Sequence, residues 1–311
     1  MAAELKAAGG VASHDVIAAR SVAADSTVRR VFNVFKLRIG IVIAFTALAG
    51  IAVTPGPALP AWQVFVLGLA VLVSSASAGA FNQYYERDLD RRMARTRRRP
   101  FVTGALQAGR GWLALIGAMV AGSTLAAALA LNPWAALYTF LGAFFYAIVY
   151  TVWLKRRTWL NIVIGGLAGS FAVLAGAAAV TPELGAVPLA LALVLFLWTP
   201  SHFWCLAITC HKDYAAAGVP MLPVVVGDAR AARIILFNTV LLVAASLAPA
   251  WYGMGGIYLV GAGLGGAYFL KRNIELVRQP DAATAMRCFH ASLAQLTLLL
   301  TAAMIDAAIA A

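Results

Sequence analysis

The chain has 311 residues, of which 62% are hydrophobic and only 12% are charged, and its formal net charge is +12. Because a water-facing surface needs far more polar side chains, these proportions exclude a single soluble core. We therefore expect an all-α polytopic membrane protein.

The first 34 residues differ from a targeting signal. They mix Ala, Ser and Asp with scattered Arg and lack the apolar core of a secretory signal. Glu4, Asp15 and Asp25 also argue against a transit peptide, because such peptides contain few acidic residues. We predict a mostly disordered cytoplasmic tail over residues 1–34 and a membrane domain over residues 35–311.

Apolar runs of about 20 residues, the length that crosses roughly 30 Å of hydrocarbon, recur along the rest of the chain. Nine runs are predicted to span the membrane: 38–55, 62–84, 111–131, 134–153, 160–180, 185–208, 232–252, 254–270 and 289–310. An odd number of spans places the two ends of the domain on opposite sides of the bilayer.

The basic residues are distributed unevenly between the connections. All 24 Lys and Arg fall in the head, up to Arg38, or after the second, fourth, sixth and eighth spans. Because basic loops favour the cytoplasmic side, we predict an N-terminus in the cytoplasm and a C-terminus outside. We expect a multi-pass protein of the inner cell membrane whose active site faces the cytoplasm. This distribution explains the net charge without nucleic acid as a partner.

The most polar stretch follows the second span. Asn82, Glu86 and Asp90 are spaced i, i+4 and i+8, so that successive members drift by only about 40° around a helix and share one face. One amide oxygen and two carboxylates are ligands that suit Mg²⁺, which is commonly completed by waters and substrate phosphates. We predict that these three residues hold Mg²⁺. A solvated helix end with local ion pairs is the alternative.

Five hydrogen-bond donors follow these acids. Residues 93–100 read Met-Ala-Arg-Thr-Arg-Arg-Arg-Pro, and the planar guanidinium group of Arg fits phosphate oxygens. The rival interpretation is that these arginines only orient the flanking spans. Asp88 lies on another face of the helix and is expected to pair with Arg91 or Arg92.

A second polar group surrounds the end of the sixth span. Asp213 could supply another carboxylate, with Lys212 as a counter-charge for phosphate, although such a pair is ordinary at a helix end. His202 lies within the span and is a functional candidate because ionisable groups are costly in a membrane. A neutral His bonded to a neighbouring helix is the alternative. Lys155 lies at the same surface, and Asp306, near the outer end of the last span, is expected to reach water.

Taken together, these motifs resemble the UbiA superfamily of intramembrane prenyltransferases, from about residue 35 to the C-terminus. The most specific stretches are Asn-Gln-Tyr-Tyr-Glu-Arg-Asp-Leu-Asp at 82–90 with the 93–100 segment, Tyr-Thr-x-x-Leu-Lys-Arg at 150–156 with Asn-Ile-Val-Ile-Gly-Gly at 161–166, Trp-Thr-Pro at 198–200 with His-Phe-Trp at 202–204, and Lys-Asp-Tyr at 212–214 with Ala-Gly-Val-Pro-Met-Leu-Pro at 217–223. The last two pairs favour members that farnesylate heme over quinone-forming relatives.

The resemblance implies a nine-helix UbiA-like bundle and a Mg²⁺-dependent transfer of farnesyl from farnesyl diphosphate to a vinyl group of heme B, which gives heme O for terminal oxidases. The metal-binding and catalytic residues it implies are Asn82, Glu86, Asp90 and Asp213. The diphosphate-binding residues are Arg95, Arg99, Lys155 and Lys212, and the residues expected to bind the heme acceptor are Trp198, His202 and Asn161.

Two other functions compete with this expectation. A UbiA-type enzyme can instead prenylate an aromatic quinone precursor. A membrane transporter would carry charges near the midplane, whereas the polar residues of this chain gather at one surface. The expected partners are farnesyl diphosphate, heme B and the lipid bilayer, with heme A synthase or an oxidase assembly factor as protein partners.

Overall fold

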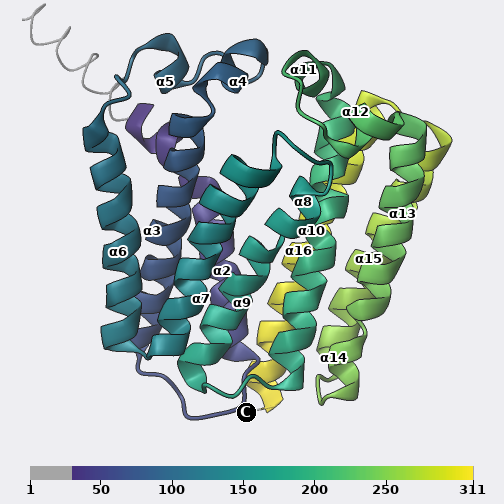
Figure 1. The fold of residues 1–311 in the computed structure, drawn as a ribbon. Coiled ribbons are helices and arrows are strands. Elements are labelled where there is room, and N and C mark those ends of the chain that lie inside the picture. Colours follow the sequence, from purple (N-terminus) through teal and green to yellow (C-terminus); the bar gives the residue numbers. More distant parts are fainter. Residues whose placement is uncertain (1–29, 311) are drawn as a thin grey trace, which may run out of the picture.

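The computed structural model describes residues 30–310, and within them the chain is helical and contains no strand (Figure 1). The predicted tail, residues 1–34, therefore lies mainly outside the described residues, while residues 30–35 are helical.

The bundle is built from long helices joined by short ones. The longer elements are α2 (Leu37–Ala52), α3 (Ala61–Tyr85), α6 (Arg110–Ala130), α7 (Pro133–Phe144), the π-helix η1 (Phe145–Leu154), α9 (Leu167–Val180), α10 (Ala186–Thr209), α13 (Asp228–Ala245), α15 (Gly256–Arg278) and α16 (Ala282–Ala310). The short helices are α4 (Arg87–Arg92), α5 (Pro100–Thr103), α8 (Asn161–Gly165), α11 (His211–Ala216), α12 (Leu222–Val226) and α14 (Ala248–Trp251).

Seven helical stretches in the described part are long and apolar enough to cross a bilayer. They are Ala61–Tyr85, Arg110–Ala130, Pro133–Leu154, Asn161–Val180, Ala186–Thr209, Asp228–Trp251 and Ala282–Ala310. The other two predicted spans fall on α2, which has only 16 residues, and on α15, which ends in a charged segment. The membrane protein is thus confirmed as a helical bundle, and the count of nine spans stays a prediction.

Close helix contacts depend on small residues. The helices α2 and α9 cross so tightly that a β-carbon at Gly176 would collide with the Ala47 carbonyl oxygen, and one at Gly50 with the Val173 carbonyl oxygen. Glycine at both positions therefore lets the two backbones touch, as is common between membrane helices.

The short helices α4, α5, α11 and α12 all lie at one end of the bundle, and the end of α16 lies at the other (Figure 1). The loops that carry the two predicted polar clusters therefore share one surface.

Asp306 does not reach water as expected. Its side chain is buried and accepts hydrogen bonds from the backbone N–H groups of Gly255, Ile257 and Tyr258 at 2.5, 3.1 and 3.2 Å. These N–H groups belong to the first turn of α15, which has no partners for them within the helix. The acid in the last span is therefore explained by a helix cap.

Candidate active site

The junction between α3 and α4 positions the three residues of the first acidic motif. The helix is interrupted at Glu86, but the backbone N–H of Glu86 donates to the Asn82 carbonyl and that of Asp90 donates to the Glu86 carbonyl. The i to i+4 pattern thus continues through the break. All three side chains are buried, at 3%, 0% and 1% exposure. They point into the protein from one face, as the spacing predicts.

Each residue of this motif contacts a basic side chain from elsewhere in the chain. Lys36 Nζ donates to Asn82 Oδ1 at 2.8 Å, and Lys155 Nζ donates to Glu86 Oε2 at 2.5 Å. Arg99 Nη1 donates to Asp90 Oδ2 at 2.7 Å. Three cations from three segments therefore converge on one row of oxygens.

One oxygen of each acid remains free. Glu86 Oε1 and Asp90 Oδ1 are buried and have no hydrogen-bond partner in the part of the chain that the structure describes. Burying a carboxylate oxygen without a hydrogen-bond partner costs free energy. The two free oxygens of Glu86 and Asp90 therefore need an explanation, such as a bound cation. No group of three His, Cys, Asp or Glu residues within 30–310 is compact enough to hold a metal alone. The residues present fit Mg²⁺, which takes one or two carboxylates and fills its shell with phosphate and water.

The π-helix η1 supplies the opposite wall. Its wider turns are visible in two bonds that span five residues, from Thr151 Oγ1 to the Tyr146 carbonyl and from the Lys155 N–H to the Tyr150 carbonyl. Thr151 Oγ1 also accepts from Asn82 Nδ2 at 3.1 Å. The extra residue in the turn brings Thr151 and Lys155 to α3, in keeping with the frequent use of π-helical turns at functional sites.

Lys36 is the residue of this site that sequence reasoning missed, because its charge had been assigned to membrane topology. It precedes α2 in a left-handed backbone conformation, with φ of 49°, which is uncommon for a residue with a β-carbon. Its Nζ also lies 3.2 Å from the hydroxyl of Tyr146. Burial lowers the pKa of Lys36 to about 7, and the nearby charges of Arg99 and Lys155 act in the same direction. An anion bound beside it would favour its charged form.

Asp213 joins the loop after α4 to the segment after α10. Its carboxylate accepts from the backbone N–H groups of Ala94 and Arg95, at 3.0 and 3.2 Å. Arg95 in turn lies 3.4 Å from the hydroxyl of Tyr214. The structure thus brings Asp213 and Arg95 together. Lys212 is exposed and forms no ion pair within residues 30–310.

The predicted pairing of Asp88 with Arg91 or Arg92 is wrong. Asp88 instead forms a two-pronged ion pair with Arg156, with distances of 2.7 and 2.8 Å. The hydrogen bonds to Arg156 hold the pKa of Asp88 below its usual range. Although Arg91 and Arg92 lie on the same helix, the segment after η1 supplies the partner, because Arg156 can bond both carboxylate oxygens at once.

The three residues expected to contact the acceptor lie on two helices that pack together, α8 and α10. Trp198 and His202 are one turn apart on α10, with their rings stacked at 4.2 Å between centroids. Pro200 lies between them and interrupts the helix bonding, and Asn238 of α13 donates to the Leu197 carbonyl in the same turn. Asn161 is fully buried at the start of α8, and its Oδ1 has no partner among residues 30–310.

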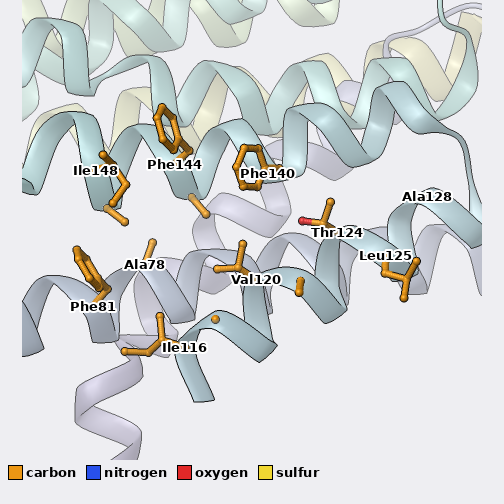
Figure 2. A pocket seen from close by; sticks show the side chains of 14 residues that line it. Ala78, Phe81, Ile116, Val120, Thr124, Leu125, Ala128, Phe140, Phe144 and Ile148 are labelled. Atoms are coloured by element: carbon orange, nitrogen blue, oxygen red, sulfur yellow. The ribbon is translucent and has the colours of Figure 1, made fainter. Parts of the chain in front are cut away.

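An apolar groove of about 560 Å³ lies between α3, α6 and the α7–η1 segment. Figure 2 shows Phe81 of α3, Ile116 and Val120 of α6, and Phe144 and Ile148 of the α7–η1 segment along it. None of the predicted site residues lines this groove. The polar site is therefore a separate feature, held between the ends of the helices.

The chain is similar to several known proteins in sequence. It is 58% identical to "Protoheme IX farnesyltransferase 2" of Paramagnetospirillum magneticum, over 88% of this chain and 95% of that protein. It is 50% identical to "Protoheme IX farnesyltransferase 1" of the same organism, over 90% and 99%. A third relative, "Protoheme IX farnesyltransferase 1" of Cenarchaeum symbiosum, is 41% identical, over 90% and 96%.

Solved structures share the fold. A UbiA homologue from Aeropyrum pernix matches with a TM-score of 0.72 and 23% identity, over 87% of this chain and 98% of that one. A UbiA homologue from Archaeoglobus fulgidus, bound to DMAPP and Mg²⁺, matches with a TM-score of 0.70 and 16% identity, over 87% and 99%. The sequence profile of the UbiA prenyltransferase family matches residues 43–299. By sequence and by fold, this chain belongs to the UbiA prenyltransferase family.

Proposed function

We propose that this chain transfers a farnesyl group from farnesyl diphosphate to a vinyl group of heme B and so produces heme O. The names of its relatives support this acceptor and this donor. The observation that carries the proposal is the pair of buried acids, Glu86 and Asp90, each with one oxygen free and the other bonded to a cation. Such a site suits a metal-bound diphosphate better than it suits an apolar substrate.

We infer a role for each charged residue. Glu86 and Asp90 would hold Mg²⁺ through their free oxygens, with phosphate and water as the main other ligands and Asn82 beside them. Asp213, predicted as a further ligand, is not grouped with these two acids in the described residues and would instead hold the loop at Ala94 and Arg95. The ion, when bound, would act as a Lewis acid that stabilises the leaving diphosphate. The homologue solved with DMAPP and Mg²⁺ supports this pairing of metal and prenyl diphosphate within the family.

The basic residues would neutralise the negative charge of the departing diphosphate. As the bond between farnesyl carbon 1 and oxygen breaks, its electrons move to the diphosphate, where Lys155 and Arg99 donate hydrogen bonds and Lys36 adds a third charge. Arg95 and Lys212 are assigned to the same anion from the loops. These donors are already held in place by the acids, so little rearrangement is needed to bind the diphosphate.

The carbon chemistry follows from the loss of diphosphate. Carbon 1 of the farnesyl group develops allylic cation character, and the π electrons of a heme vinyl group form the new carbon–carbon bond. The positive charge then lies on the vinyl carbon next to the porphyrin ring. Water adds to that carbon and releases a proton to solvent, which completes the hydroxyethylfarnesyl group. The apolar helices around the site would keep water from the first cation.

The arrangement of the loops supports the proposed membrane orientation. The helices α4, α5, α11 and α12 lie at one end of the bundle (Figure 1), and many of the described basic residues lie on α4 and α11 or in the segments that follow α4 and η1. We propose nine spans, with the N-terminus and the active site on the cytoplasmic side of the inner membrane.

The test uses membranes that contain the full chain. They would be incubated with heme B, farnesyl diphosphate and Mg²⁺, and the pigments would be separated and identified by mass. We expect heme O, and none from membranes that lack the chain. Parallel reactions would offer an aromatic acid in place of heme. A prenylated aromatic acid without any heme O would overturn the acceptor and support the quinone alternative.

A further inference from the structure

The ring of His202 is enclosed by two helices, α10 and α16. It is stacked between Trp198, at 4.2 Å, and Phe289, at 4.3 Å between ring centroids. The residue is only 6% exposed. Its Nδ1 lies 2.7 Å from the hydroxyl oxygen of Ser292 on α16. The ring is thus held on both faces and at one edge.

The hydroxyl of Ser292 decides where the histidine proton is. Ser292 Oγ lies 2.6 Å from the Phe289 carbonyl oxygen, which has no proton and must accept. The single hydroxyl proton is therefore used in that bond. The Ser292 oxygen can then only accept from the histidine, so Nδ1 carries a hydrogen.

The rest of the surroundings leave the histidine neutral. No carboxylate bonds to this ring within residues 30–310. A buried imidazole without an acidic partner is neutral, because burial disfavours the charged form. A neutral ring has one N–H, so Nε2 has a lone pair. That lone pair lies in the plane of the ring, where the two stacked aromatic rings do not cover it.

A second bond shows that Ser292 is held firmly. The indole N–H of Trp198 donates to the Ser292 carbonyl at 2.9 Å. Ser292 is fully buried, and it bonds to both ring residues of α10: its carbonyl to Trp198 and its hydroxyl to His202. Its position, and hence the direction of the bond to His202, depends on the packing of the two helices.

We propose that Ser292 is a positioning residue that holds His202 in the Nδ1–H tautomer, so that Nε2 binds the iron of the heme acceptor. This inference rests on the proposed function, because it takes heme as the acceptor. Histidines that bind a metal usually donate their other N–H to a fixed acceptor, which sets the tautomer and the ring orientation. Binding through the iron would hold the porphyrin in one orientation, with one vinyl group offered to the farnesyl cation.

The tautomer can be measured without heme. The full chain, with ¹⁵N in its histidine rings, would be placed in lipid nanodiscs, and the His202 signals would be assigned by their loss in His202→Gln. We expect a protonated Nδ1 and an unprotonated Nε2. Ser292→Ala should change this to a mixture of tautomers. The control is Ser123→Ala on α6, where a buried hydroxyl bonds only to the backbone three residues earlier. A protonated Nε2 in the parent chain, or no change in Ser292→Ala, would refute the assignment.

Heme binding tests the second half of the proposal. Ferric heme would be titrated into the same proteins and followed by its absorbance and electron paramagnetic resonance, which report a nitrogen ligand. Because outer partners of metal ligands contribute about 10- to 100-fold in affinity, Ser292→Ala should bind heme that much more weakly. Ser292→Thr, which keeps the hydroxyl, should bind like the parent.

The outcomes separate this inference from the proposed function. A parent chain that forms heme O but shows no nitrogen ligand would overturn iron binding by His202 and leave the farnesyl transfer intact. A folded parent chain that neither binds heme nor forms heme O would overturn the proposed function itself.

Discussion

Two carboxylates on the short helix α4 provide a matched test of the metal assignment. Asp90 is 1% exposed, accepts from Arg99 through one oxygen and leaves the other free. Asp88, two residues earlier, has a side chain that is 55% exposed and is paired with Arg156. The substitutions Asp90→Asn and Asp88→Asn remove the same charge with the same small change in shape.

The expected effects differ by orders of magnitude. Loss of one preorganised charged group in an active site typically lowers kcat about 10²- to 10³-fold, which corresponds to about 3–4 kcal/mol. We expect a loss of this size or larger for Asp90→Asn. An exposed ion pair contributes about 0–1 kcal/mol, so Asp88→Asn should stay within about fivefold of the parent rate.

The assay is the steady-state formation of heme O by purified protein at several Mg²⁺ concentrations. Thermal unfolding in detergent would show that both variants are folded. We expect the Asp90→Asn variant to fold, because the amide oxygen of the new side chain can still accept a hydrogen bond from Arg99. The reasoning is refuted if Asp90→Asn turns over within fivefold of the parent, or if Asp88→Asn loses as much activity as Asp90→Asn.

Four further outcomes are expected. Lys36→Met should raise the KM for farnesyl diphosphate about 10- to 100-fold, because a hydrogen bond to a charged group contributes about 1.5–3 kcal/mol, and an unchanged KM in steady-state assays would contradict its role. Removal of Mg²⁺ with a chelator should abolish heme O formation but not heme binding, and added Mg²⁺ should restore it. Asp306→Ala should lower the Tm with little change in the kcat of the folded protein, since each unpaired buried N–H costs about 1–3 kcal/mol, and an unchanged Tm would show that the cap is dispensable. The variant Arg98→Cys should be labelled by an impermeant thiol reagent added on the cytoplasmic side, and Glu183→Cys by the same reagent added on the outside. Labelling of each variant is compared with that of the parent chain, and the reverse pattern would show the opposite membrane orientation.

The sequence predicted those features of the site that depend on residues close together in the chain. The spacing of Asn82, Glu86 and Asp90 predicted one shared face, and the structure buries all three there. Apolar runs also predicted the positions of the helices. Their ends were less predictable: the run expected to end at residue 270 continues as α15 to Arg278, because a helix can leave the apolar region without losing its backbone hydrogen bonds.

The contacts between side chains on different helices could not be predicted from the sequence. Lys36 lies 46 residues before Asn82, and the partner of Asp88, Arg156, lies 68 residues after it. A basic residue beside a span already has an explanation in the positive-inside rule, so its charge does not point to any one acid. The contact between Lys36 and Asn82 is seen only in the structure. There the left-handed backbone of Lys36 lies before α2, and its Nζ reaches Asn82.

The sequence by itself determined a membrane-embedded helical chain, a row of side-chain oxygens on one face of a helix end, and the family to which the chain belongs. These features depend on composition, on the 3.6-residue period and on short motifs, all of which are local. Only the tertiary structure decided which cation neutralises which acid, which N–H groups Asp306 caps, and which side chain of α16 bonds to His202. Those features depend on side chains up to 90 positions apart, and only the packing of the helices brings them within hydrogen-bond distance.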